Sequence, residues 1–420
     1  MRAVLMSEPR ARAVALALSG LVLALAVPYS FLYLGNRLPY LEESNYLALA
    51  TNMARHLSYS IDGVRSTAWW PPGFPLALVL PVWLGANLPT LRLFNFAALA
   101  LAVYLMYAMV RNIATPAAGL LAAALVVGYP VLFYAAGTFF QTPLGCFLFV
   151  WVLYRLSRPG GLSDRTLAVT GLIFGYLMLT VPSFVFQLLV VALWTARARP
   201  EARLRAAVIL IVPALLMVSV WSVRNYTVFQ EFVFVSNNGG LNLFIGNSEH
   251  AAPNAAPNVR GIDETYETFI ARGMNEVAQD RYYRRRALEF ILGDKARALK
   301  LYLFKNLNYF NIHNQIYAAS EMSFDRDVVM LLTYGPLLGL FLLRLILVRK
   351  FLISRFEGLL LLLYFTNIPF AALFITRVRY RLPFDFLMIA VVAIFAAQWA
   401  QRRGGAGSAG PPPTPQGRRT

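Results

Sequence analysis

Two adjacent carboxylates, Glu42 and Glu43, follow the first apolar segment of the chain, and Tyr46 comes three residues later. Adjacent side chains point in different directions, so one carboxylate can face a cavity while the other meets solvent or a cation. A positioned carboxylate can act as a general base that deprotonates a hydroxyl. The same acids could instead cap a helix that begins near Ser44, where negative charge suits the helix N-terminus. The residues alone leave both interpretations open.

Three arginines, Arg377, Arg379 and Arg381, lie between the last two apolar segments. Guanidinium groups bind phosphate through paired hydrogen bonds, so Arg379 and Arg381 predict a site for a lipid phosphate. Anchoring to lipid headgroups is the alternative that the same chemistry permits, and Arg377 would matter less if it only meets headgroups. Arg224, at the end of another apolar segment, could add a second phosphate contact or extend its charged end to the membrane interface.

The composition indicates a membrane protein. The 420 residues are 58% hydrophobic and 14% charged, whereas soluble domains carry about a quarter charged residues. The apolar residues gather in blocks of about 20, the length that crosses a bilayer as a helix. The net charge of +18 comes mostly from basic residues at the ends of these blocks, which is typical of membrane topology. We therefore expect an all-α, polytopic transmembrane bundle that contacts membrane lipids and binds no nucleic acid.

Motifs for cofactors and metals are lacking. The one cysteine, Cys146, lies in an apolar segment, so neither a disulfide nor a cysteine-based metal site is expected. His56, His250 and His313 are far apart and have no metal-ligand spacing. The sequence also lacks a glycine-rich phosphate loop, which argues against ATP-driven transport. We expect no cofactor and no metal, although a metal site built only from carboxylates stays open.

Ten membrane spans are predicted from the apolar blocks. Their approximate limits are 14–34, 91–110, 116–134, 140–156, 166–180, 183–196, 204–223, 328–348, 356–376 and 382–400. Segment 72–88 is a further candidate, but Pro71, Pro72, Pro75 and Pro81 interrupt a helix there. If this segment does not cross, every short basic loop and both termini lie on the cytoplasmic side, as the positive-inside rule requires. We therefore predict that it lies at the outer interface or dips into it.

Two long outer loops, 35–90 and 224–327, separate the predicted spans. The first loop carries the two glutamates, and apolar residues recur at helical spacing behind Tyr46, so we expect an interfacial amphipathic helix there. The second loop has a turn signal at 237–240, and its part from 276 to 310 has a helical pattern with a basic cluster.

The expected domain organisation is simple. A transmembrane domain covers residues 1–400, and a cytoplasmic tail follows at 401–420. Proline and glycine dominate this tail, and a segment with so few apolar residues is predicted to be disordered.

In their order and topological sides, these features resemble the C-type-fold (GT-C) glycosyltransferases, specifically the bacterial relatives of the dolichyl-phosphate-mannose–protein mannosyltransferases and the aminoarabinose lipid A transferases. That family has an Asp-Glu-x-x-Tyr motif in the first outer loop, which Glu42-Glu43-Ser44-Asn45-Tyr46 matches here, and then a proline block, which residues 71–75 match. Further matches lie at 223–226, 239–240, 246–247 and 379–383. Two departures are that Glu42 replaces the leading aspartate and that Trp70 stands where some members have a lysine.

The resemblance implies transfer of a sugar from a polyprenyl-phosphate donor to a lipid, glycan or protein acceptor at the outer face of the cell membrane. A phosphate departs as a stable anion, so one carboxylate base is enough, and arginines stabilise the developing charge. Direct displacement would invert the anomeric centre. The resemblance implies that Glu42 and Glu43 are catalytic, with Glu42 at the family's leading acid position. The residues that it implies for donor binding are Arg379, Arg381, Arg224 and Tyr46.

Two other functions stay open at this point. A non-catalytic translocator or scramblase of lipid-linked sugars would carry charged residues in the middle of the membrane. Arg344 is the main candidate for such a residue, and it lies near the predicted cytoplasmic end of its span. A polymerase or ligase of surface polysaccharide would share the donor chemistry and take a glycan acceptor. The acids gather at one face of the membrane instead, which favours an enzyme.

Overall fold

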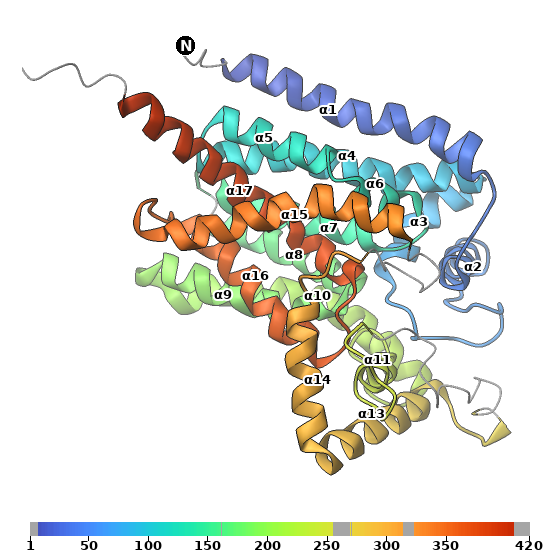
Figure 1. Cartoon of the computed structure of the whole chain (residues 1–420). Coiled ribbons are helices and arrows are strands. Elements are labelled where there is room, and N and C mark those ends of the chain that lie inside the picture. The colour runs from blue at the N-terminus through green and yellow to red at the C-terminus, as the bar shows by residue number, and fades with distance from the viewer. Residues whose placement is uncertain (1–6, 161, 255–268, 270, 314–322, 407–420) are drawn as a thin grey trace, which may run out of the picture.

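The fold is a bundle of helices. The structure is a computed structural model, and it describes residues 7–160, 162–254, 269, 271–313 and 323–406. Within these residues every named element is helical and no strand occurs, which confirms the all-α prediction. The long helices run side by side, and the first and last helices have their free ends at the same end of the bundle (Figure 1). Helices of the two long loops gather toward the opposite end.

Sixteen α-helices are described, and α1 continues directly into a π-helical segment, Tyr29–Leu34. In chain order, the first nine are α1 (Glu8–Pro28), α2 (Leu41–His56), α3 (Gly73–Trp83), α4 (Leu88–Ile113), α5 (Pro116–Val127), α6 (Pro130–Gly137), α7 (Thr142–Ser157), α8 (Asp164–Thr180) and α9 (Val185–Ala198). The remaining helices are α10 (Arg203–Phe229), α11 (Gly239–Gly246), α13 (Glu276–Gly293), α14 (Lys295–Asn308), α15 (Phe324–Ile346), α16 (Arg355–Leu373) and α17 (Val378–Ala406).

Prolines and polar caps fix many of the helix starts. Pro116 and Pro130 occupy the first turns of α5 and α6, where their missing N–H group costs no hydrogen bond. Asn87 caps α4, and its side chain accepts a hydrogen bond from the Thr90 backbone N–H at 3.0 Å. The chain bends by 55° between α5 and α6, at the short break that contains Gly128. This bend makes the pair either a broken span or a re-entrant loop.

The core lies around α4 and α17. Their apolar windows are 67% and 78% buried, whereas those of α1 and α15 are only 22% buried. Large apolar side chains such as Leu16, Leu25 and Leu332 stand exposed on these outer helices. Apolar surface exposed to this extent indicates contact with lipid chains, so the chain is a multi-pass membrane protein.

The predicted number of ten spans is not reproduced by helix length. Among the described residues, six helices are long and apolar enough to cross a membrane, or seven if α5 and α6 form one span. The predicted spans at α7, α8 and α9 correspond to helices of 16, 17 and 14 residues, short of the roughly 20 residues that a perpendicular crossing needs. Helix α3 in segment 72–88 has 11 residues, which fits the expectation that it does not cross.

The loops differ in detail from the sequence-based expectations. The amphipathic helix predicted after Tyr46 is α2, and the helical pattern from 276 to 310 is two helices, α13 and α14, which break at Gly293 and Asp294. Helix α10 continues to Phe229, so the predicted loop start at 224 lies within a helix. Helix α17 likewise continues through Ala406, past the predicted domain end at 400, and residues 407–420 of the predicted tail lie outside the described residues.

Candidate active site

The two adjacent glutamates point to different surroundings at the start of α2. Glu43 is fully buried, and its carboxylate accepts hydrogen bonds from the backbone N–H groups of Tyr40 at 2.9 Å and Phe139 at 2.7 Å. Burial raises the pKa of Glu43, and these two hydrogen bonds to the charged form oppose the shift. Glu43 therefore caps α2 and ties it to the segment between α6 and α7.

Glu42 faces the beginning of α17 instead. Its Oε2 lies 3.8 Å from Nη1 of Arg379, and the two side chains keep 32% and 17% of their surfaces exposed. This distance is longer than a hydrogen bond, so the two charges attract each other without a direct hydrogen bond. An acid from the beginning of α2 and a guanidinium from the beginning of α17 thus meet at a partly exposed point.

Tyr380 orients the guanidinium of Arg379. Nη2 of Arg379 donates a hydrogen bond to the Tyr380 hydroxyl at 2.7 Å, and the guanidinium carbon lies 4.8 Å from the centre of the same ring. A cation over an aromatic face is held by the ring's electrostatic field. The planar fork of Arg379 is therefore held in place beside Glu42, with part of its surface open.

Arg381 has the opposite environment. Its side chain is 1% exposed, and Nε lies 3.1 Å from Oδ1 of Asp385, which is itself fully buried. The guanidinium also donates to the backbone oxygens of Tyr309 at 2.8 Å and Asn311 at 2.9 Å, and it lies 3.8 Å from the Tyr334 ring centre. With its charge balanced and its surface covered, Arg381 holds the end of the α14 segment against α17.

The segment before the arginines is braced by α14. Lys305 is fully buried and donates hydrogen bonds to the backbone oxygens of Gly246 at 3.0 Å and Phe374 at 3.1 Å and to the Asn247 side chain at 3.1 Å. Burial lowers the pKa of Lys305 to about 8. Arg377, in the same segment, is 5% exposed, so its side chain has little surface with which to contact lipid headgroups.

Tyr46, on the buried face of α2, belongs to an aromatic cluster. It is buried, and its ring centre lies 5.5 Å from Trp70, 5.4 Å from Phe74 and 6.0 Å from Phe140. Aromatic pairs in this range of distances stabilise packing. The cluster packs α2 against the proline block and against the segment between α6 and α7, which Glu43 also contacts. Tyr46 therefore helps to hold the glutamates in position.

The proline block packs closely on α8. A Cβ atom at Gly73 would lie 2.3 Å from the Thr180 side chain and 2.7 Å from its backbone nitrogen, a separation that only glycine allows. The Tyr176 hydroxyl donates to the Gly73 backbone oxygen at 2.7 Å, and Tyr59 donates to the Trp70 backbone oxygen at 3.0 Å. This block therefore fixes the segment between α2 and α3 on the bundle.

Arg224 joins the two long loops. Nη1 donates to the Thr67 backbone oxygen at 2.8 Å, and the guanidinium lies 4.8 Å from the Trp221 ring centre. Beside it, the buried Glu276 accepts hydrogen bonds from the Thr67 hydroxyl at 2.8 Å, the Ala68 N–H at 2.5 Å and the Asn237 side chain at 2.8 Å. Arg224 is thus engaged with loop backbone rather than directed at Glu42.

The structure brings together Glu42 and Arg379, keeps Glu43 and Tyr46 directly behind them, and puts Arg381 into a closed buried pair. Sequence reasoning missed Asp385, Lys305 and Glu276. Asp385 could have been found from its spacing, because it lies four residues after Arg381 on one helix. Among the described residues, no group of three or more His, Cys, Asp or Glu side chains is arranged to hold a metal ion.

Comparisons with known proteins bear on the fold. No protein-family model matches the sequence, and no curated protein matches it. Among solved structures, the chain is similar to the Archaeoglobus fulgidus oligosaccharyltransferase in complex with Zn and sulfate, with a TM-score of 0.50 and 13% identity over 93% of this chain and 51% of that chain. The chain thus spans about half the length of the archaeal protein.

Two further structures are those of ArnT from Cupriavidus metallidurans. The apo state has a TM-score of 0.40 and 14% identity over 94% of this chain and 78% of that chain. The state bound to undecaprenyl phosphate has a TM-score of 0.42 and 14% identity over 94% and 79%. The likeness to the archaeal protein identifies the architecture as the GT-C fold, as the sequence resemblance predicted.

Proposed function

We propose that this chain is an integral-membrane glycosyltransferase that moves a sugar from a polyprenyl-phosphate donor to a hydroxyl of a lipid, glycan or protein acceptor. The observation that carries the proposal is the juxtaposition of Glu42 and Arg379, 3.8 Å apart and partly exposed, at the beginnings of α2 and α17. A carboxylate and a guanidinium are the two groups that this transfer needs. The GT-C fold is consistent with this chemistry.

In the proposed reaction, Arg379 binds the phosphate of the donor through its planar fork. Glu42 accepts the proton of the acceptor hydroxyl while the hydroxyl oxygen forms a bond to the anomeric carbon. The bond between that carbon and the phosphate oxygen breaks, and the phosphate leaves with the electron pair, stabilised by Arg379. The attack comes from the side opposite the leaving group, so the anomeric centre is inverted.

The other predicted site residues have supporting parts in this proposal. Glu43 positions Glu42 through its hydrogen bonds to the backbone, and Tyr46 packs the same helix against Trp70. Contact of Arg381 and Arg224 with the donor phosphate stays a prediction. Their contacts favour an indirect part, because Arg381 is paired with Asp385 and Arg224 holds loop backbone.

The contacts of Arg344 weaken the translocator alternative. Arg344 is fully buried, and it forms a two-point ion pair with Glu357, with Nε–Oε1 and Nη2–Oε2 distances of 2.8 Å and 3.0 Å. Nη1 also donates to the Phe351 backbone oxygen at 2.7 Å. A charge that is balanced in this way stabilises the turn between α15 and α16 and offers nothing to a passing headgroup.

The experiment that tests the proposal uses the purified full chain in detergent. It is incubated with a panel of radiolabelled polyprenyl-phosphate sugars and with membrane extract as the source of acceptor. We expect one donor to lose its label to an acceptor, and the Glu42→Gln protein to be inactive with the same donor. If no donor is consumed while the protein in vesicles speeds the movement of lipid-linked sugar between leaflets, the translocator alternative is correct.

A further inference from the structure

Helix α14 has two opposite apolar faces, and only one of them is covered by protein. Ala298 and Leu301 are buried on the face that packs toward the bundle. On the other face, Leu299, Leu303 and Leu307 have 59%, 56% and 69% of their surfaces exposed. These three leucines follow one another at four-residue spacing, which aligns them along a single stripe of the helix. A helix in water would carry polar side chains at these positions.

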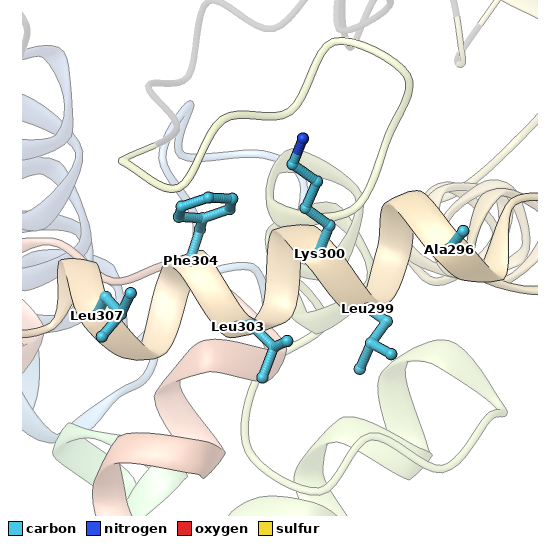
Figure 2. A pocket seen from close by; sticks show the side chains of 6 residues that line it. All are labelled: Ala296, Leu299, Lys300, Leu303, Phe304 and Leu307. Carbon is cyan, nitrogen blue, oxygen red and sulfur yellow. The ribbon is translucent and has the colours of Figure 1, made fainter.

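The exposed face is a continuous apolar surface rather than a set of separate leucines. Figure 2 shows Leu299 and Leu303 along one edge of α14, and Lys300 and Phe304 along the other. The residues that line the shallow groove there are Ala296, Leu299, Lys300, Leu303, Phe304 and Leu307. An unbroken apolar surface of this kind marks an interaction site.

The direction of α14 fits a membrane surface. In Figure 1 it runs crosswise to the long helices of the bundle, so its axis lies along the plane of the membrane that those helices cross. Its last turns are fixed to the end of α16, because Lys305 donates to the Phe374 backbone oxygen and Asn308 to the Thr376 backbone oxygen at 2.8 Å. The helix therefore lies at the level where α16 ends, with its apolar stripe on the side away from the protein.

The charges on α14 match an anionic headgroup layer. Within its sequence, α14 contains four basic residues and no acidic one. Lys295, Arg297 and Lys300 are exposed, and Nζ of Lys300 lies 6.0 Å from the Phe304 ring centre. A long lysine side chain beside an apolar stripe can lay its methylene groups on the stripe and extend its ammonium group to lipid phosphate. A second copy of this face would instead bring like charges together.

We propose that the exposed face of α14 lies in the membrane interface of the leaflet at the site end of the bundle, with Leu299, Leu303 and Leu307 among the lipid chains and Lys295 at the headgroup phosphates. Through Lys305 and Asn308, this helix fixes the depth of the 374–377 segment that precedes Arg379. The inference rests on the membrane spans and not on sugar transfer, so either can fail without the other.

Spin labelling tests this placement in the full chain. Single cysteines replace Leu303 or Lys295 in a Cys146→Ser background, carry a nitroxide label, and are studied in vesicles of phosphatidylethanolamine and phosphatidylglycerol. Oxygen concentrates in lipid, whereas a neutral nickel chelate stays in water. We expect the label at 303 to be accessible to oxygen and protected from nickel, and the label at 295 to show the reverse.

Two results would overturn the proposal. Equal access of the nickel chelate to positions 303 and 295 would mean that the stripe stands in water. Dipolar broadening between labels at 303 that disappears on dilution with unlabelled protein would mean that a second copy covers the stripe. Both positions are exposed, so neither substitution removes a buried contact. A Leu299→Cys variant repeats the measurement one turn earlier and should agree with position 303.

Discussion

Arg379 and Arg381 are separated by one residue, yet their surroundings differ in every respect that matters for binding. Arg379 is partly exposed, and Glu42, 3.8 Å from it, is partly exposed as well. Arg381 is buried against Asp385, and its Nη1 donates to two backbone oxygens. Arg379 can leave Glu42 and bind a phosphate instead, so we call this an open pair. If Arg381 left Asp385, a buried carboxylate would lose its compensating charge, so we call that a closed pair. The same residue type thus serves a candidate site in one case and the fold in the other.

The largest effect should come from breaking the closed pair. Asp385→Ala or Arg381→Ala leaves one buried charge without its partner, and we expect a loss of about 3–5 kcal/mol in the free energy of unfolding. Thermal unfolding in detergent measures this loss. Arg379→Ala is the matched control and should unfold within about 1 kcal/mol of the wild type. Equal stability of all three variants would remove the distinction between the two arginines.

Arg379 should matter for the donor instead. Arg379→Ala removes a charged hydrogen-bond donor from the proposed phosphate site, at a cost of about 1.5–3 kcal/mol in donor binding or in kcat/KM. Arg379→Lys should recover little of this, because an ammonium group lacks the planar fork. Donor affinity is measured in detergent, where no anionic bilayer surface competes. Unchanged affinity and turnover in Arg379→Ala would show that this arginine does not bind the donor.

Glu43 should behave as a structural acid. Glu43→Gln keeps one acceptor oxygen but sets a donating amide near the N–H groups of Tyr40 and Phe139, so we expect a loss of about 1–2 kcal/mol in stability. Unfolding temperature and turnover are measured on the same preparation. Turnover per folded molecule should stay close to that of the wild type. A stable but inactive Glu43→Gln protein would move the base from Glu42 to Glu43.

The smallest effect should come from Lys305, a buried cation that, unlike Arg381, contacts no carboxylate among the residues that the structure describes. Its pKa is lowered to about 8 from an ordinary value of 10.5. Between these values the unfolded chain binds a proton that the folded protein does not, so stability should rise with pH by about 1 kcal/mol per pH unit at most. Unfolding of the wild type and of Lys305→Met between pH 8 and pH 10 measures this. A slope that persists in Lys305→Met would assign the titration to another group.

Much of the fold could be predicted from the sequence, because hydropathy and proline positions act locally. The all-α bundle and the helix that contains Tyr46 follow from residue spacing alone, whereas the non-crossing of segment 72–88 stays a prediction. The number of spans does not follow in the same way. Hydropathy finds the apolar runs at α7, α8 and α9, but it does not say whether helices of 14 to 17 residues reach across a bilayer.

The candidate site was predictable only in outline. The residues alone did not separate Glu42 from Glu43, and only the family resemblance put Glu42 first, because the contact that distinguishes Glu43 comes from Phe139, 96 residues away. Glu276 and Thr67 are 209 residues apart in the sequence, so their hydrogen bond could not be predicted either. For Asp385, the four-residue spacing from Arg381 could be seen in the sequence, whereas its burial could not.

Turnover by Glu42→Gln tests the central proposal most directly. Glutamine keeps the size and hydrogen-bonding capacity of the side chain but removes its basicity, so transfer should fall by roughly 10²–10⁴-fold. Donor affinity and protein stability should stay near those of the wild type, because Glu42 is partly exposed and Arg379 remains in place. Measured with the donor that the wild type uses, this combination would support Glu42 as the base. A Glu42→Gln protein with full activity would contradict the proposal.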